Sequence, residues 1–445
     1  MTKPRKAMAQ PDMGDIGKLM ARLAAKHANI TTASQAMATW RYLDFMDPNT
    51  GLPTIVQEYL IGARGFVAGR ICQLRATYSK GKTSFCLLQY GAAQKQSNAF
   101  CYHVETEGSA TPADRVFAIG ANPDELLQSE QSSLEECLAS IDELVCEIRG
   151  GFGGSIGVTG RNIKTVYTDP IDAKCEKPIL IGVDSLSALG MQDKVDEDVA
   201  DMSKVSQVAK TARIMREYFR DRVQRFNQNK VLLFLTTQET VKLEMGAKVF
   251  AGPQKTSVAA EAIGIHASFG IDFESAKWVD KKTGLRAGDV LKLTTFKNKV
   301  SPRNRTVELF ITNNAGFDLI HSDANFLIEH PASPFADGAG IFTGEKLCYR
   351  TPQGIMCKVL SDKSFKSEEE FVRAFYDNKD VLMTAREGMR IRGFGFDFET
   401  KYGKYDNEGN LMSDVADPTL VPGVQPPPPD PDDRSPLARH FADGD

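Results

Sequence analysis

The sequence predicts an α/β protein built on a mostly parallel β-sheet that helices cover on both faces. Two observations carry this prediction. Apolar runs with little polar alternation recur between residues 51 and 321, as expected for strands that are buried on both faces. Segments of helix length separate most of these runs, and connections of that length join parallel neighbours. The runs expected to form strands are residues 69–74, 99–104, 178–183, 230–236, 289–296 and 306–312.

Composition places the chain among soluble globular proteins. Hydrophobic residues make up 42% and charged residues 25% of the 445 residues, which is an ordinary balance. No apolar stretch of about 18 residues occurs, and residues 1–6 lack the apolar run of a secretory signal. We therefore expect a cytoplasmic protein with no membrane partner. The eight cysteines are scattered without a C-x-x-C pair, so we expect them to be reduced.

Four regions are expected along the chain. Residues 1–50 form an N-terminal helical segment, in which an amphipathic helix over 14–27 needs a partner for its apolar face, either on its own domain or on a neighbouring subunit. Residues 51–321 form the core, with a glycine-rich insertion at 150–176. Residues 322–400 form a small α+β domain, where Ser367 and Glu370 fit a helix capping box. Residues 401–445 are acidic and proline-rich, and we expect them to be disordered.

A loop that follows the first core strand matches a phosphate-binding motif. The motif G-x-x-x-x-G-K-[ST] supplies backbone N–H groups, a lysine for the terminal phosphates and a hydroxyl for Mg²⁺. Here Ala76 replaces the first glycine, and every other position holds. A solvated lysine turn is the alternative interpretation. The residues assigned to nucleotide contact are Ala76, Thr77, Tyr78, Ser79, Lys80, Gly81, Lys82, Thr83 and Ser84.

Carboxylates follow two of the other expected strands. Asp184 ends the apolar run at 178–183 and is expected to hold Mg²⁺ together with Thr83. Glu105 and Glu107 follow the run at 99–104, and either of them could orient and deprotonate an attacking water. A strand-end turn for Asp184, and exposed loop charges for the two glutamates, are the alternative interpretations.

The order of these motifs resembles the RecA family of DNA recombinases. The resemblance covers residues 51–320. Glu107 followed by Ala110-Thr111-Pro112-Ala113 is most similar to the T-even phage, UvsX-like branch. The matching elements are Gly69-Arg70-Ile71, Gly81-Lys82-Thr83, Glu105-Thr106-Glu107, Val183-Asp184-Ser185, Thr237-Gln238 and Lys297-Asn298-Lys299.

The resemblance implies a RecA-like ATPase core that uses ATP and Mg²⁺. Lys82 and Thr83 would bind the phosphates and Mg²⁺, Asp184 would support the metal, and Glu107 would activate water. Gln238 would sense the γ-phosphate. Lys297 and Lys299 would reach across a filament interface to the neighbour's ATP.

The resemblance also implies two DNA-binding loops. The second loop would occupy residues 239–261, and the first would occupy residues 190–204. The helix expected over 205–219 could instead be a solvated surface helix. Departures from the family are Ala76, the Val258-Ala259 pair in the second loop and the insertion at 150–176. The candidate DNA contacts are Met202, Lys204, Lys210, Arg213, Lys242, Lys248, Phe250 and Lys255.

The leading functional hypothesis is an ATP-dependent recombinase. It would form a helical homo-oligomeric filament on single-stranded DNA and pair that strand with homologous double-stranded DNA, with loading or single-strand-binding proteins as further partners. The expected location is the cytoplasm of a bacterial or phage-infected cell. Two alternatives stay open. One is a hexameric DNA motor or helicase in which Lys297 or Arg303 acts in trans, and the other is a non-catalytic DNA-coating accessory protein.

Overall fold

The computed structural model describes residues 40–108, 111–151, 169–190, 204–242, 254–256, 258–279, 283–329, 348–357 and 363–378. The helix expected over 14–27, most of the insertion at 150–176 and the tail from residue 401 lie outside these ranges. Most of the two expected DNA-binding loops also lies outside them.

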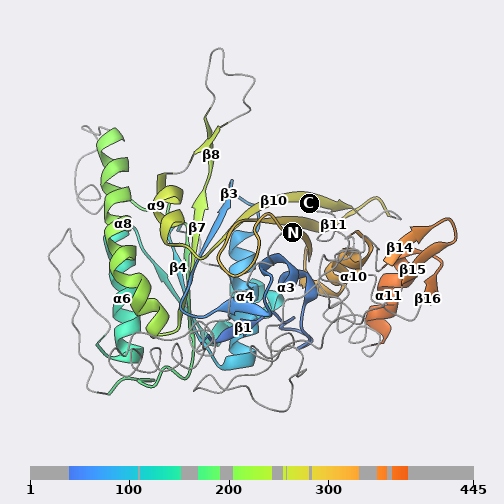
Figure 1. Ribbon diagram of the computed structural model, residues 1–445, viewed down its shortest axis with the longest axis horizontal. Coiled ribbons are helices and arrows are strands. Elements are labelled where there is room, and N and C mark those ends of the chain that lie inside the picture. The colour runs from blue at the N-terminus through green and yellow to red at the C-terminus, as the bar shows by residue number, and fades with distance from the viewer. Residues whose placement is uncertain are drawn as a thin grey trace, which may run out of the picture. The chain divides into compact units, whose positions relative to one another are not determined.

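A nine-stranded sheet organises the described core (Figure 1), with the strand order β13-β12-β11-β10-β3-β7-β6-β4-β5. The segment from β10 to β5 is parallel throughout, which confirms the α/β prediction of a mostly parallel sheet. Each of the six expected runs overlaps a strand of this sheet. The parallel strands are β3 (Ile71–Ala76), β4 (Phe100–Glu105), β5 (Leu126–Glu130), β6 (Ile179–Asp184), β7 (Val231–Gln238) and β10 (Phe269–Val279).

The other side of the sheet is antiparallel, which the sequence did not predict. Strands β11 (Arg286–Asn298), β12 (Thr306–Thr312) and β13 (Gly316–Asp318) follow β10 as a meander. Only residues 299–305 connect β11 to β12, and a parallel connection needs a crossover of a dozen residues or more. The short connections therefore impose antiparallel pairing on the runs at 289–296 and 306–312.

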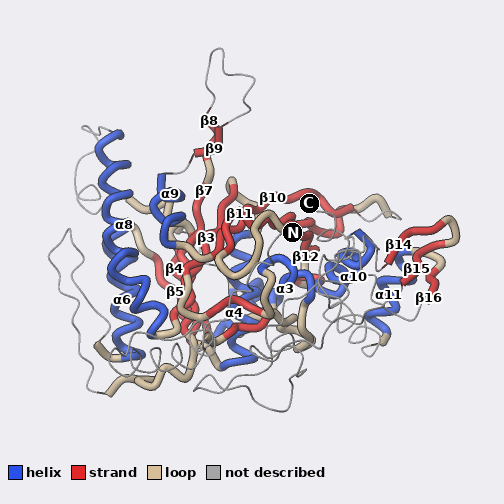
Figure 2. Tube along the Cα trace, viewed as in Figure 1, coloured by secondary structure: helices blue, strands red, loops and turns tan. Residues whose placement is uncertain are grey.

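Helices cover both faces of the sheet (Figure 2). On one face Leu138, Phe219 and Ile263 of α6, α8 and α9 belong to one buried cluster with strand residues such as Leu233. Successive strand residues point to opposite faces, and Phe234 on the other face meets Phe66 edge to face. The helices are α3 (Ile55–Ile61), α4 (Lys82–Ser97), α5 (Ala113–Ile119), α6 (Leu134–Arg149), α8 (Lys204–Gln228), α9 (Val258–His266), α10 (Leu319–Glu329) and α11 (Glu368–Asp377), with a 3₁₀ turn at Pro123–Glu125. Among these described helices, none combines the length and apolar character that a membrane span needs.

Two small antiparallel pairs flank the main sheet. Strand β1 (Tyr42–Asp44) pairs with β2 (Gly65–Val67), so residues from the expected N-terminal segment at 1–50 pair with the core. Strands β8 (Thr240–Lys242) and β9 (Gln254–Thr256) form a ribbon that follows the end of β7 and flanks the expected second DNA-binding loop.

The C-terminal region combines a three-stranded sheet with one helix. Strands β14 (Cys348–Thr351), β15 (Gly354–Cys357) and β16 (Lys363–Phe365) pair in sequence order. The predicted cap of α11 is confirmed, since Ser367 Oγ accepts the Glu370 N–H at 3.1 Å. The carboxylate of Glu370 in turn accepts the Lys366 N–H at 2.8 Å. Helix α10 contains the expected boundary at 321/322, and it contacts β12 as well as α11.

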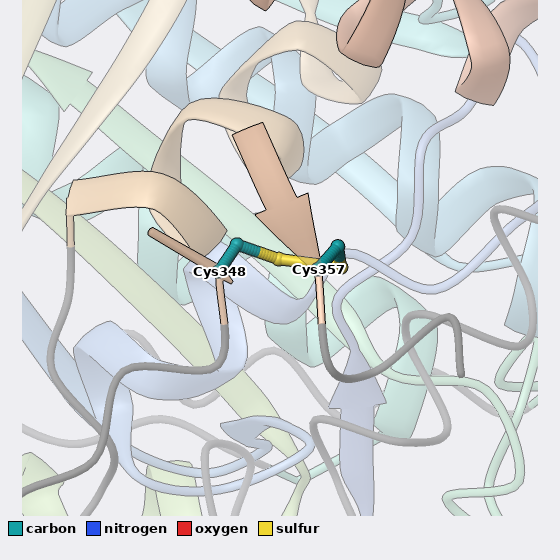
Figure 3. Close-up of a disulfide and its surroundings, with 2 residues drawn as sticks. All are labelled: Cys348 and Cys357. Carbon is teal, nitrogen blue, oxygen red and sulfur yellow. A yellow bond between two sulfur atoms is a disulfide. The ribbon is translucent and has the colours of Figure 1, made fainter. Parts of the chain in front are cut away.

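The expectation that all cysteines are reduced is wrong for one pair. Cys348 and Cys357 stand opposite each other in the β14–β15 register and form a disulfide (Figure 3). Their spacing along the chain does not reveal this pairing, because it depends on where the hairpin turns. The other six cysteines form no disulfide.

A buried ion pair joins α6 to α8. Arg222 donates two hydrogen bonds to Asp142 Oδ2, at 3.1 and 2.7 Å. Tyr218 donates a further bond to Asp142 Oδ1 at 2.9 Å. Both charged side chains are almost fully buried, with exposed fractions of 2% for Arg222 and 0% for Asp142. Each charge therefore depends on the other, because no water replaces the missing partner.

We expect Asp142→Ala to lower the free energy of unfolding by about 3 kcal/mol, because it strands the Arg222 guanidinium in the core. Urea denaturation followed by circular dichroism measures this loss. The matched control is Asp221→Ala, which breaks the exposed pair with Arg220 and should change stability by less than about 1 kcal/mol. Equal losses for the two variants would contradict the assignment.

Candidate nucleotide site

The predicted site residues that meet in the structure do so at the carboxyl edge of the parallel strands. In the strand register Ala76 lies beside Gln238 and Glu105 lies beside Asp184. Loops that follow parallel strands emerge at one edge of the sheet, which is where such folds place their ligands. The residues gathered there are Lys82, Thr83, Glu107, Asp184 and Gln238.

The phosphate loop has the local structure that its motif requires. Strand β3 ends at Ala76 and α4 begins at Lys82. Ala76 is a buried strand residue whose carbonyl accepts the Glu239 N–H at 3.0 Å. Its backbone is not left-handed, so alanine in place of glycine is compatible with this geometry. Gly81 has a φ of 83°, and a Cβ there would lie 2.6 Å from Leu291 Cδ1, so this position requires glycine.

The start of α4 is suited to an anion. The first i→i−4 bond of the helix runs from the Phe85 N–H to the Gly81 carbonyl at 2.9 Å. The preceding N–H groups of Lys82, Thr83 and Ser84 therefore have no partner within the helix, and they lie at the positive end of its dipole. Lys82 Nζ donates to the Thr77 carbonyl at 3.1 Å. Burial lowers the pKa of Lys82, and the carboxylates of Asp184 and Glu107 oppose this shift.

The oxygen atoms beside the loop fit a divalent cation. Thr83 Oγ1 donates to Asp184 Oδ2, and Thr236 Oγ1 donates to Asp184 Oδ1 at 2.6 Å. A carboxylate and a hydroxyl are hard oxygen ligands of the kind that Mg²⁺ takes, with water and phosphate oxygens completing its shell. The sequence did not point to Thr236, whose only signal is a hydroxyl within the buried run of β7.

The two competing glutamates differ in burial and in hydrogen bonding. Glu105 is buried, and its Oε1 accepts the N–H groups of Thr106 at 3.1 Å and Glu107 at 2.9 Å. Burial raises the pKa of Glu105, and these two hydrogen bonds oppose the shift. Glu107 is exposed, and its Oε1 accepts from Gln238 Nε2 at 2.5 Å and from Ser185 Oγ at 3.2 Å. Glu105 thus holds the turn that presents Glu107.

Hydroxyl groups that the sequence did not single out join the loops of the site. Thr106 Oγ1 accepts the Ser185 N–H at 2.7 Å and donates to the Ser185 carbonyl at 2.8 Å. Ser187 Oγ accepts the Gln238 N–H at 3.0 Å. The loops after β4, β6 and β7 therefore have fixed relative positions around Glu107.

Lys297 and Lys299 lie away from this group, at the other end of the strands. Strand β11 runs antiparallel to β10, and Lys297 pairs with Gly270, whose parallel neighbour is Gln73, the third residue of β3. The Lys299 N–H donates to the Ser268 carbonyl, and the Ser268 N–H donates to the carbonyl of Ile71, the first residue of β3. Lys297 Nζ donates to the carbonyl of Gly264 and, at 3.3 Å, to that of Ile265. Burial and the nearby charge of Lys299 lower the pKa of Lys297. The phosphate loop of the same subunit is at the opposite sheet edge.

The candidate DNA contacts are only partly described. Met202, Lys248 and Phe250 lie outside the described residues, and the backbones of Lys204, Lys242 and Lys255 belong to α8, β8 and β9. Lys210 on α8 is half-buried. Arg213 is exposed and pairs with Glu217 at 2.9 Å, one helical turn away.

Comparison with known proteins relates this core to RecA. The family model for the RecA N-terminal domain matches residues 173–318, a segment that contains Asp184, Gln238, Lys297 and Lys299. The chain is 25% identical over 263 residues to the protein RecA of Paracoccus denitrificans. It is 26% identical over 295 residues to that of Laribacter hongkongensis and 27% identical over 262 residues to that of Borrelia hermsii.

These similarities cover part of each protein. The match takes in 59% of this chain and 63% of the Paracoccus protein. The corresponding shares are 65% and 71% for the Laribacter protein, and 58% and 62% for the Borrelia protein. Several of the relatives are thus matched over slightly less than two thirds of their length. Together with the mostly parallel sheet, the matches support a RecA-like core.

His103 lies under the carboxylates of the site. Its side chain is fully buried on β4, and its Nδ1 is 3.3 Å from the hydroxyl of Tyr90. Its Nε2 has no hydrogen-bond partner and is 3.9 Å from Glu105 Oε2. Burial lowers the pKa of His103, and the charge of Asp184 opposes this shift. The imidazole is therefore neutral in the folded protein near neutral pH.

We expect His103 to make the protein less stable as the pH falls below the ordinary histidine pKa of 6.5. Its folded-state pKa lies below its unfolded-state pKa, so unfolding takes up a proton in this interval and the free energy of unfolding decreases with decreasing pH. His103→Leu should flatten this decrease, as measured by urea denaturation across about pH 5 to 8. His266→Gln, at a more exposed histidine, should flatten it less. An unchanged slope in His103→Leu would refute the expectation.

Proposed function

We propose that the protein is an ATP-dependent, DNA-binding recombinase of the RecA type, which forms a filament on single-stranded DNA and pairs it with a homologous duplex. One observation carries this proposal. The phosphate loop with Lys82, the Thr83–Asp184 pair and the Glu107–Gln238 pair converge at a single sheet edge. This set supplies the parts that hydrolysis of a nucleoside triphosphate requires.

Each part has a chemical role in the proposed site. The N–H groups at the start of α4 and the Lys82 ammonium would hold the phosphates. Mg²⁺, held by Thr83 and Asp184, would neutralise phosphate charge. Glu107 would orient the attacking water and accept its proton. Gln238 donates to Glu107, so a γ-phosphate that attracts the Gln238 amide would free the Glu107 carboxylate.

The position of Lys297 and Lys299 supports a site shared between subunits. Both lysines lie at the opposite end of the strands from the phosphate loop of their own chain. Burial lowers the pKa of His266, the last residue of α9, and the charges of Lys297, Lys299 and Arg220 lower it further. We propose that this cationic group meets the nucleotide of a neighbouring copy and that the assembly is a filament of such copies.

The ribbon β8–β9 supports a link between nucleotide and DNA. Gln238 ends β7, and the ribbon begins two residues later at Thr240. The Glu239 N–H donates to the Ala76 carbonyl at 3.0 Å, and a Glu239 carboxylate oxygen is 3.5 Å from Arg75 Nε on β3. The segment that would carry DNA contacts is therefore fastened to the strand that precedes the phosphate loop. By linkage, nucleotide and DNA should strengthen each other's binding.

The likeness to the T-even phage branch rests on Glu107 and residues 110–113, whereas the relatives named above are bacterial proteins. Location in the cytoplasm and partnership with loading or single-strand-binding proteins are parts of the same proposal. Electron microscopy with and without single-stranded DNA separates a filament from the ring of a hexameric motor.

We expect Lys82→Ala to abolish ATP turnover and ATP-dependent binding of single-stranded DNA, because it removes the cation that faces the terminal phosphates. A coupled ATPase assay with and without single-stranded DNA measures turnover, and fluorescence anisotropy measures DNA binding. The matched control is Lys277→Ala, at an exposed lysine of β10, which should behave as the wild type. Normal turnover by Lys82→Ala would refute the site, and the absence of turnover in the wild type would favour a DNA-coating accessory protein.

A mixture of two inactive variants tests the shared site. We expect Lys299→Ala to fold and bind ATP normally but to lose DNA-stimulated turnover, because its own phosphate loop is intact and its neighbour's site lacks a cation. Mixing it with Lys82→Ala should restore part of the turnover, since some interfaces then combine an intact loop with an intact Lys299. No restoration across mixing ratios, or full turnover by Lys299→Ala alone, would contradict a trans site.

A further inference from the structure

Arg115 of α5 reaches the start of α4 beside the phosphate loop. Its Nη2 donates to Ser84 Oγ at 2.9 Å. Ser84 directly follows Thr83 in the first turn of α4, and its side chain is buried. Although Arg115 lies 31 residues further along the chain, the packing of α5 on α4 brings its guanidinium to this turn.

The location is electrostatically unfavourable for a cation. The start of a helix carries a partial positive charge, which attracts anions and disfavours cations. Lys82 adds a full positive charge in the same turn. Within the described part of the chain, the Arg115 guanidinium has no ion-pair partner, and its one hydrogen bond is to the Ser84 hydroxyl. Some other exposed arginines there pair with a carboxylate, as Arg213 does with Glu217 and Arg286 with Asp289. A bound anion would supply the missing negative charge.

The geometry points to Arg115 as a nucleotide-binding residue that contacts the phosphate nearest the ribose. This inference rests on the proposed nucleotide site. Lys82 serves the terminal phosphates and Thr83 the metal between them, so Ser84, next in the same turn, faces the opposite end of the triphosphate. A serine hydroxyl both accepts and donates. Ser84 Oγ accepts from Arg115 and retains its own proton for a phosphate oxygen, to which the free N–H groups of the guanidinium can also donate.

A purely structural role for the contact makes a different prediction. If the Arg115–Ser84 hydrogen bond only fastens α5 to α4, its loss would lower stability and leave nucleotide affinity unchanged. If Arg115 binds phosphate, its loss would lower nucleotide affinity and leave the nucleotide-free protein nearly as stable as before. Thermal unfolding without nucleotide and titration with nucleotide therefore separate the two roles.

The experiment is calorimetric titration of the full-length protein with MgADP, MgATP and inorganic triphosphate. We expect Arg115→Ala to weaken the binding of all three by about tenfold, the effect of one lost charge-assisted hydrogen bond. The affinities of Arg115→Lys should lie between those of the wild type and Arg115→Ala, because lysine keeps the charge and loses the planar fork of donors. Arg286→Ala, which removes an exposed arginine with a bidentate carboxylate partner, is the matched control and should bind as the wild type does.

Two results would overturn the inference. One is an unchanged affinity for MgADP in Arg115→Ala. The other is weaker binding of MgADP with unchanged binding of inorganic triphosphate, which would place the guanidinium on the ribose or base. Failure of the proposed function itself is distinguishable, since the wild type would then bind no nucleotide and Lys82→Ala would not differ from it. If Arg115→Ala lowers the unfolding temperature, Arg115→Lys takes its place in the test. Weaker binding of both MgADP and inorganic triphosphate by Arg115→Lys then supports the inference, and unchanged binding of both overturns it.

Discussion

The Asp184 carboxylate ties together the segments on which the candidate site depends. One of its oxygens accepts the hydroxyl of Thr83 at the start of α4, and the other accepts that of Thr236 near the end of β7. A buried carboxylate needs such donors, because water does not reach it. The result is that the phosphate loop, the end of β6 and the end of β7 share one anchor. Thr106 and Ser185 extend the same arrangement to the loop that carries Glu107.

The two edges of the sheet, at the carboxyl and amino ends of its parallel strands, carry groups of different charge. The carboxyl edge collects Glu107, Asp184 and the anion-binding start of α4, which together suit a metal-bound triphosphate. The opposite edge presents Lys297 and Lys299. Antiparallel addition of β11 produces this separation, because it returns the chain to the end of the sheet where β10 begins. A single copy cannot bring the two edges together, so the proposed action of Lys297 and Lys299 on a nucleotide requires a second copy.

Local sequence patterns predicted the strands and the phosphate loop, because apolar runs and a glycine-lysine-threonine turn are properties of adjacent residues. Apart from the Thr83–Asp184 pair, they did not predict contacts between distant segments. Thr106 meets Ser185 across 79 positions, and the Cys348–Cys357 pair depends on a hairpin register. Thr236 and Arg115 likewise give no signal in their own neighbourhoods. The antiparallel half of the sheet follows from connection length, a feature that apolar runs alone do not convey.

Whether alanine can replace glycine at position 76 depends on the backbone conformation there. In sequence terms alanine at this position weakens the resemblance, because glycine there suggests a left-handed conformation. In the structure the strand continues through Ala76, and the left-handed positions are Ser79 and Gly81 further along the loop. The glycine that the geometry requires is therefore the one that the chain retains. What Ala76 contributes instead is a carbonyl for the Glu239 N–H, a contact that joins the phosphate loop to the segment leading to the β8–β9 ribbon.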